Sequence, residues 1–322
     1  MGKTHCREMK HLLSILIFCT MLLNAADYAG YSGAFLRMGT SARSMAMGGG
    51  FTAELDRGFT AYHNPASVAF LEKRQASFSY HSLALERKFI ASSIAVHLPP
   101  TAGVGVAWIS AGVDDIDGRT SAGEATSTLS TSEDAVYFSF AQRLQSWISV
   151  GVNVKILYNQ LPMNESDLAG KGIGFDVGVL MRPGKRMTLG LMVQDLNSYY
   201  QWNTGKVFEE EGRVYRDVFP SIFRTGITYK MRKLYIVGDA GIIAGEKSDG
   251  SFGHLGQSIR AGVEYTYRKN YFFRGGYGNG RIGVGAGMNF SFLKKNDAFL
   301  DYAMIAELPA GMAHIITYAF HF

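Results

Sequence analysis

The final third of the chain alternates almost without interruption between apolar residues and small or polar ones. In the stretch 281–293, apolar residues interleave with glycine, asparagine and serine, and the chain ends on Tyr318, Phe320 and Phe322. A period of two places each set on one face of a β-strand. One face is then apolar and aromatic, and the other is polar or glycine-rich. This pattern is typical of a transmembrane β-barrel, whose outer face contacts lipid.

The composition favours strands over helices as the elements that cross a membrane. Charged residues make up only 18% of the 322-residue chain. A transmembrane helix needs about 20 apolar residues in a row, and the apolar run at 12–23 is shorter. Because basic residues precede this run and small residues follow it, residues 1–26 are predicted to be a secretory signal peptide. Both cysteines, Cys6 and Cys19, lie within it, so we expect no disulfide in the exported chain.

The remaining alternation predicts fourteen antiparallel strands. A closed single-chain barrel requires an even number of strands, each with about 9–11 residues for one crossing. The predicted fold is therefore all-β, a 14-stranded antiparallel transmembrane β-barrel over 74–322. The strands are expected at 74–84, 87–98, 102–111, 133–144, 147–159, 171–182, 186–197, 219–230, 233–243, 256–268, 270–278, 281–293, 297–306 and 311–322.

The connections between these strands sort by length. The even-numbered connections, such as 145–146 and 231–232, are short, whereas the long ones, including 112–132 and 198–218, are all odd-numbered. Bacterial outer-membrane barrels alternate short periplasmic turns with longer surface loops in this way. Basic residues concentrate in the short turns, where anionic phospholipid attracts them. No segment combines a basic patch with stacking aromatic residues, so nucleic acid is not an expected partner.

Residues 27–73 lack this alternation and are rich in glycine, alanine, methionine and serine. We expect short helical turns here, broken by glycine. A fourteen-stranded barrel is wide enough to need filling. We therefore predict that this segment is a plug, or hatch, inside the lumen of the barrel. An N-terminal extension in the periplasm is the alternative.

A motif near the end of this segment resembles that of a known family. Gly-Gly-Gly-Phe-Thr-Ala at 48–53 is followed by a short acidic spacer and by Tyr-His-Asn-Pro-Ala at 62–66. This arrangement resembles the hatch of the FadL-type outer-membrane transporters, and more closely that of their shorter PorV/PorQ-like relatives. The stretches 33–39 and 193–196 are similar to those relatives as well. The resemblance implies a monomeric barrel, with an N-terminal hatch, in the cell outer membrane.

The resemblance implies two alternative functions. FadL-type members bind long-chain fatty acids or other hydrophobic molecules and take them up passively, which makes such a ligand the expected partner. PorV-like members instead serve protein secretion and surface attachment, for which the connection 198–218 is the expected contact with a protein. Outer-membrane lipid and the barrel-assembly machinery, through the terminal strand ending at Phe322, are further expected partners. We expect neither enzymatic activity nor a cofactor.

The candidate site residues lie in the hatch. The tripeptide Asn64, Pro65 and Ala66 is predicted to fix the turn into the first strand, because proline biases the preceding residue towards extended backbone and asparagine bonds to nearby backbone. Arginine suits a ligand carboxylate, and methionine suits adaptable apolar surfaces, although core packing is the alternative for the apolar members. The candidate ligand-binding residues are Arg37, Arg43, Phe35, Met38, Met45, Met47 and Phe51.

The predicted inner face of the barrel also carries charges. Because an unpaired buried charge is costly, we expect these residues to brace the plug against the wall, or one or two of the arginines to bind a ligand carboxylate. The histidines are too scattered to predict a metal site. Asn279-Gly280 indicates a hairpin rather than a nucleotide-binding loop. The inward charges are Arg143, Lys155, Asp176, Arg224, Arg260, Glu264, Arg274 and Asp301.

Overall fold

The computed structural model describes residues 30–120, 122–162, 168–205, 212–246, 251–293, 296–307 and 311–322. The predicted signal peptide and the first three residues of the predicted hatch lie outside the described residues. Within the described ranges, no helix is long and apolar enough to cross a membrane.

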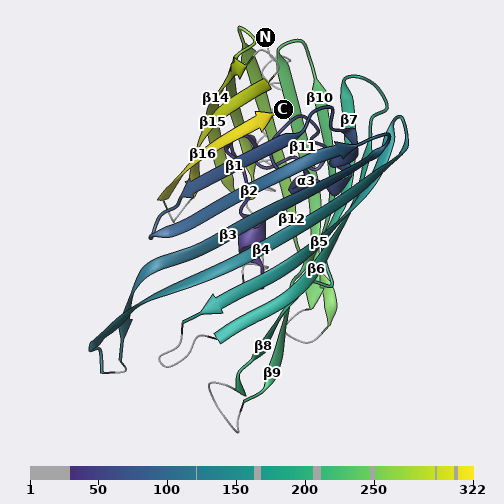
Figure 1. Cartoon of the computed structure of the whole chain (residues 1–322). Coiled ribbons are helices and arrows are strands. Elements are labelled where there is room, and N and C mark those ends of the chain that lie inside the picture. Colours follow the sequence, from purple (N-terminus) through teal and green to yellow (C-terminus); the bar gives the residue numbers. More distant parts are fainter. Residues whose placement is uncertain are drawn as a thin grey trace, which may run out of the picture.

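The described strands form one antiparallel sheet of sixteen strands, fourteen of which close into a barrel (Figure 1). Neighbours in the chain pair with each other, β5 pairs with β6, and β1 pairs with β16 to close the ring. The fold predicted from the alternation is therefore confirmed. The barrel strands are β1 (Gln75–Ser82), β2 (Arg87–Leu98), β3 (Ala102–Arg119), β4 (Ala125–Gln145), β5 (Ile148–Leu161), β6 (Leu168–Met181), β7 (Met187–Leu196), β10 (Ser221–Lys230), β11 (Leu234–Glu246), β12 (Phe252–Tyr267), β13 (Tyr271–Gly278), β14 (Arg281–Leu293), β15 (Asn296–Glu307) and β16 (Gly311–His321).

Two of the predicted long loops contain strands instead. The expected loop 112–132 is wrong, because β3 and β4 remain paired as far as Arg119 and Ala125. This part of β4 is rich in serine and threonine on both faces, so it lacks the apolar alternation by which a strand is predicted. The connection 198–218 contains the hairpin of β8 (Tyr199–Asn203) and β9 (Val214–Val218). Both hairpins project from the same end of the barrel (Figure 1).

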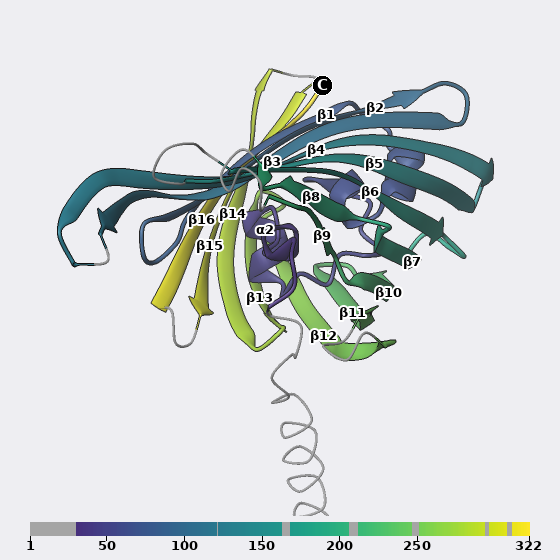
Figure 2. The ribbon, with the colours of Figure 1, turned by 90° about the horizontal axis from the view of Figure 1, so that it is seen from below.

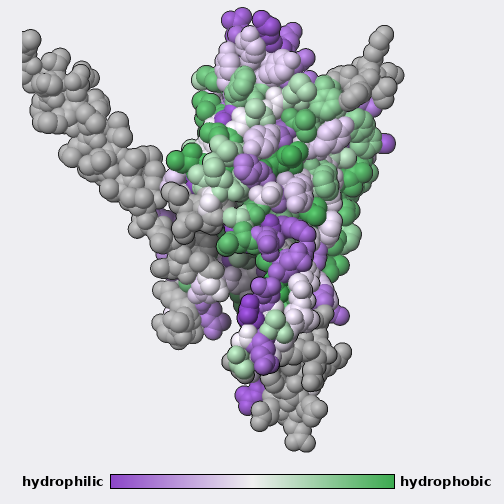
Figure 3. Space-filling view, turned by 90° about the vertical axis from the view of Figure 1, so that its left-hand side faces the viewer, coloured by the Kyte–Doolittle hydropathy of each residue, from purple (hydrophilic) through white to green (hydrophobic). Residues whose placement is uncertain are grey.

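The outer face of the barrel is apolar. Along β5, exposed Val152, Val154 and Ile156 alternate with buried residues that point inward. Figure 3 shows apolar side chains over much of the upper half of one face, with hydrophilic side chains gathered at the upper edge. Exposed aromatic residues, including Trp147 and Tyr265, lie towards the short turns. An apolar band with aromatic residues at its borders is the surface that lipid contact requires.

The helices of the described residues are short and lie inside the ring of strands (Figure 2). They are η1 (Ala34–Arg37), α2 (Ala42–Ala46), α3 (Thr60–His63) and η2 (Pro65–Phe70). The Ser41 hydroxyl caps α2 by accepting a hydrogen bond from the Ser44 amide at 3.2 Å, and glycines at positive φ follow α2, as is usual at helix ends. Helix α2 contacts β13 to β16, whereas η2 contacts β2 to β6. The segment 30–73 therefore bridges the lumen from one side of the wall to the other.

Glycines on the inner face of the wall make room for this segment. A side-chain carbon on Gly190 of β7 would collide with the Thr52 carbonyl oxygen, and one on Gly178 of β6 would collide with the Asn64 amide oxygen. The glycines that interleave with apolar residues in the sequence thus mark where hatch backbone approaches the wall. Other wall glycines with hatch atoms at this range include Gly103, Gly151, Gly262, Gly276, Gly278 and Gly283.

Replacing Gly190 by leucine should displace the hatch and open an ion path, because the nearest atoms belong to backbone and cannot rotate away. We expect closed wild-type protein in planar bilayers and a measurable single-channel conductance for Gly190→Leu. Gly275→Leu is the matched control, since a side chain there meets no atom within 4 Å. A Gly190→Leu barrel that keeps the heat-modifiable gel mobility of a folded barrel and stays closed would contradict this account.

Candidate functional site

A buried carboxylate on the wall binds the hatch through two of its arginines. Glu264 of β12 places its Oε2 atom 3.0 Å from Nε of Arg43 and 3.4 Å from Nη2 of Arg57, both in the hatch. The same oxygen lies 2.6 Å from Nε of Arg274 on β13. All four side chains are almost fully buried. Charge-assisted hydrogen bonds of this kind are among the strongest in proteins.

Further charges complete this cluster. Arg274 also contacts Asp301 of β15 at 2.7 Å, and Glu54 of the hatch lies 3.2 Å from Arg43. Burial alone would lower the pKa of Arg43, but the carboxylates of Glu264 and Glu54 raise it well above its ordinary value. Arg43 is therefore a fixed cation that holds the hatch to the wall. We call Arg43, Glu54, Arg57, Glu264, Arg274 and Asp301 the hatch ion cluster.

A second buried ion cluster lies across the lumen. Lys155 of β5 contacts Asp176 of β6 at 2.6 Å and also Asp195 of β7. Beside it, the Asn153 amide donates a hydrogen bond to the Ala61 carbonyl oxygen of the hatch at 3.0 Å. Of the predicted inward charges, five therefore pair with one another or with the hatch, as the bracing interpretation requires: Lys155, Asp176, Glu264, Arg274 and Asp301.

The predicted motif fixes the hatch to the wall between these clusters. The Asn64 side chain accepts a hydrogen bond from the Ala66 amide at 3.1 Å, which caps η2. Its amide nitrogen lies 2.9 Å from the Thr52 carbonyl oxygen and 3.2 Å from that of Val179 on β6. Pro65 opens η2 at the first helical position, where proline is well tolerated. The motif therefore joins two parts of the hatch to each other and to a barrel strand.

The structure places the seven candidate ligand-binding residues in three different surroundings. Arg43, Met47 and Phe51 are buried against the wall, with the Arg43 guanidinium 5.0 Å from the ring centre of Phe51. Phe35 belongs to an aromatic cluster described below. The three that share a cavity are Arg37, Met38 and Met45.

This cavity, of about 40 Å³, faces the end of the barrel with the long connections. Arginines from three strands reach it: Arg224 of β10, Arg260 of β12 and Arg281 of β14. None of its described lining residues is acidic. Arg224 is 6% exposed, its Nε atom has no hydrogen-bond partner among the described residues, and it forms no ion pair with them. We call this the arginine cavity, and it has the charge and size to hold a carboxylate.

Strand alternation in the sequence places Arg224 and Arg260 inside the barrel, whereas Arg281 and His63 of the same cavity were not predicted. Burial, together with the positive charges of Arg224 and Arg260, lowers the pKa of His63 well below its ordinary value. The ring is therefore neutral. No periodic signal could identify His63, because the hatch has no regular repeat.

An aromatic cluster adjoins the arginine cavity. Tyr62 lines the cavity and also packs in this cluster, where its hydroxyl donates to the Leu36 carbonyl oxygen at 2.5 Å. The hairpin β8–β9 covers the cluster by inserting Tyr200 and Trp202. The Trp202 indole donates to Asp217 of β9 at 2.8 Å, which holds the hairpin closed. The remaining large members are Phe35, Phe59, Phe89, Ile109, Tyr137, Leu157 and Phe219.

The described part of the chain contains neither a metal site nor a nucleotide-binding loop. No group of three or more histidines, aspartates or glutamates there is arranged to hold a metal ion. The turn at Asn279 and Gly280 has positive φ at both residues and joins two paired strands. The residues 278–283, which match a dinucleotide-binding motif by sequence, therefore form a β-hairpin.

Comparisons with known proteins show the fold. No protein-family model and no curated protein matches the sequence. The solved structures that resemble the barrel include a FadL homologue of Pseudomonas aeruginosa (TM-score 0.62, 10% identity, covering 88% of this chain and 98% of that one), the toluene transporter TbuX of Ralstonia pickettii (0.60, 15%, 88% and 97%) and the toluene transporter TodX of Pseudomonas putida (0.57, 13%, 88% and 97%).

At these identities the likeness establishes architecture alone. The described chain has the fold of the FadL-type barrels over nearly the full length of those proteins. The predicted FadL-type resemblance is therefore confirmed in the fold. The closer relation to the PorV/PorQ-like branch stays a prediction.

Changing Glu264 to glutamine should destabilise the protein by about 3 kcal/mol or more, because three buried arginines lose a shared anion. The urea midpoint of unfolding, followed by heat-modifiable gel mobility, measures this effect. Lys73→Gln is the control, since it breaks the ion pair of Lys73 and Asp297, whose side chains are 47% and 35% exposed, and such pairs contribute at most about 1 kcal/mol. Equal midpoints for the two variants would show that the hatch ion cluster does not stabilise the fold.

Acidification should weaken the folded protein through His63. Below about pH 6.5 the unfolded chain binds a proton at this residue, whereas the folded site, with its lowered pKa, does not. Stability is therefore lost as the pH falls from 6.5 towards the folded pKa. Between pH 7.5 and 5.5 this group should cost about 1 kcal/mol. His63→Gln should remove that part of the pH dependence, and an unchanged dependence of the urea midpoint in this variant would refute the assignment.

Proposed function

We propose that this protein is an outer-membrane β-barrel through which hydrophobic molecules with an anionic head group, of the long-chain fatty acid type, are taken up passively. The arginine cavity carries this proposal, because it gathers four arginines, and no acidic residue among its described lining, beside an aromatic cluster. A carboxylate fits the first and an alkyl chain fits the second. The outer-membrane location is supported by the apolar outer face and by the sorting of short and long connections.

The cavity has room for the head group alone. Its volume, about 40 Å³, is far below the roughly 300 Å³ at which small-molecule sites begin. The alkyl chain must therefore displace side chains of the aromatic cluster. The hairpin β8–β9 is the element that can move, since β8 pairs with barrel strand β6 at only two positions, through Gln201 and Trp202. A ligand that enters from the side of the long connections would lift this hairpin and bind between hatch and wall.

The anionic head group distinguishes this proposal from transport of a neutral hydrocarbon. Two of the similar structures are toluene transporters, and toluene has no charge to place near four arginines. Arg224 is the decisive residue, since its guanidinium is buried, its Nε atom has no hydrogen-bond partner and it forms no ion pair with a described residue. Leaving such a charge unpaired is costly, and a ligand carboxylate would remove that cost.

A second candidate function is a role in protein secretion, as the PorV-like resemblance implies. One observation favours it: all five residues of β9 are exposed, among them Val214, Tyr215 and Val218. Strand β9 pairs with β8 and ends the sheet order, so its other edge is open. Open strand edges accept an added strand from another chain. This role predicts a co-purifying envelope protein and no defect in lipid uptake on deletion.

Arg224→Gln should weaken binding of dodecanoate about tenfold, because a charge-assisted hydrogen bond to a carboxylate is lost. Binding of neutral dodecanol should stay unchanged. Arg232→Gln, in the short turn between β10 and β11, removes the same charge far from the arginine cavity and is the matched control. Titrations of the purified barrel in nanodiscs give the affinities. Equal affinity of wild type and Arg224→Gln for dodecanoate would exclude the arginine cavity as the head-group site.

A further inference from the structure

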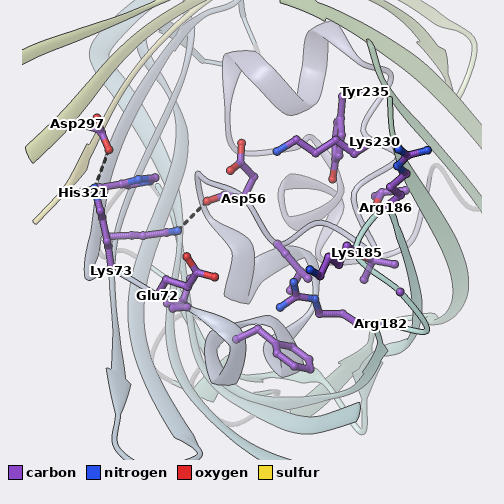
Figure 4. Close-up of a pocket in the computed structure, with 17 residues that line it drawn as sticks. Asp56, Glu72, Lys73, Arg182, Lys185, Arg186, Lys230, Tyr235, Asp297 and His321 are labelled. Atoms are coloured by element: carbon purple, nitrogen blue, oxygen red, sulfur yellow. Dashed lines mark hydrogen bonds and ion pairs between the residues drawn. The ribbon is translucent and has the colours of Figure 1, made fainter. Parts of the chain in front are cut away.

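A larger cavity, of about 360 Å³, opens on the opposite side of the hatch, at the end of the barrel with the short turns (Figure 4). Its walls come from the β6–β7 turn, the end of β10, the start of β1 and the hatch. This volume lies within the range of roughly 300–1,000 Å³ that small-molecule sites occupy. We call it the inner-mouth cavity.

One wall of the inner-mouth cavity is cationic. Arg182, Lys185 and Arg186 come from the β6–β7 turn, and Lys230 ends β10. None of these four forms an ion pair with a described residue. Figure 4 shows Lys185 and Arg182 reaching into the cavity from this side. These four residues therefore make this wall of the cavity cationic.

The acidic residues around the cavity are mostly neutralised by other partners. Asp297 lies 2.8 Å from the Lys73 ammonium. Asp56 lies 4.0 Å from Arg43 and 3.9 Å from Arg57 of the hatch ion cluster. Glu72 is the one carboxylate of the described lining without an ion pair there. Positive charge thus exceeds negative charge in the space itself.

The floor of the cavity is apolar. Leu55, Phe70 and Leu71 of the hatch line it, and Phe70 and Leu71 are almost fully buried. The Arg182 guanidinium lies 5.3 Å from the ring centre of Phe70, which holds the charge at the border between floor and wall. A cationic wall above an apolar floor is complementary to a molecule with an anionic head and an alkyl tail.

We propose that the inner-mouth cavity is a binding site for an anionic amphiphile, with its carboxylate or phosphate head on the cationic wall and the start of its tail on Phe70 and Leu71. Two sources can supply this chemistry: cargo that has passed the hatch, or a phospholipid of the adjoining leaflet. The site does not depend on the transport proposed above, because the hatch separates it from the arginine cavity.

The test uses the full-length protein carrying Arg224→Gln, in which binding of an anion in the arginine cavity is weakened. A loss of binding at the inner-mouth cavity is then distinguishable from a loss of binding at the arginine cavity. Octyl phosphate and octanoate are the probes, and octanol is the neutral comparison. The variant Lys185→Gln/Lys230→Gln removes two charges from the cationic wall. Arg232→Gln/Lys233→Gln removes two charges from the neighbouring short turn, which does not line the cavity. Heat-modifiable gel mobility checks that every variant is folded.

We expect Lys185→Gln/Lys230→Gln to bind both anionic probes at least about tenfold more weakly, and the turn variant to bind them as its parent does. Octanol should bind weakly to all. Equal losses in the two double variants, or octanol binding as tight as octanoate, would overturn the proposal, because either result would reflect overall charge or apolar partitioning alone.

Native mass spectrometry distinguishes the two sources of the ligand, cargo and phospholipid. The same proteins are measured after release from nanodiscs that contain phosphatidylglycerol. Retention of this lipid by the parent and its loss in Lys185→Gln/Lys230→Gln would assign the site to a lipid head group. Probe binding without lipid retention would assign it to cargo. Probes that fail to bind the parent protein at all would overturn the site itself.

Discussion

The shared contact of one wall carboxylate with three arginines is the interaction on which the arrangement depends. Glu264 binds Arg43 and Arg57 of the hatch and Arg274 of the wall through a single oxygen atom. Without it, two hatch cations would be buried against a cationic wall residue, which is strongly unfavourable. Because the partners come from β12, β13 and two points of the hatch, this cluster fixes where the hatch lies across the lumen, and hence where the two cavities lie on either side of it.

The rest of the hatch is held by close approach rather than by a large apolar core. Glycines of the wall admit hatch backbone at contact distance, and Asn64 joins the hatch to β6. Such contacts are specific in position, and each is small in area. The aromatic cluster, in contrast, contains side chains of the hatch, of the wall and of β8 in the hairpin β8–β9. A hydrophobic ligand would therefore compete more readily with the cluster than with the ionic and backbone contacts that hold the hatch.

The sequence predicts the barrel well because lipid on one side of a strand and hatch on the other impose a period of two. That signal disappears where both faces meet water, which is why the extension of β3 and β4 was missed. The strands β8 and β9 have only five residues each, so their alternation is too short to predict a strand. It is also absent in the hatch, whose short helices have no repeat. Arg43 and Arg37 both lie in a segment rich in small residues, so the sequence does not distinguish their roles. Only the fold shows that Arg43 is bound by Glu264, whereas Arg37 lines a cavity with Arg224.

Native mass spectrometry of the protein extracted gently from membranes, followed by release and identification of bound lipid, tests the central claim most directly. The account predicts a fatty acid, or another amphiphile with a single carboxylate, in stoichiometric amount with the wild-type barrel, and fewer copies of it on Arg224→Gln. A ligand-free barrel that arrives with a protein partner, or the same number of copies on wild type and Arg224→Gln, would contradict it.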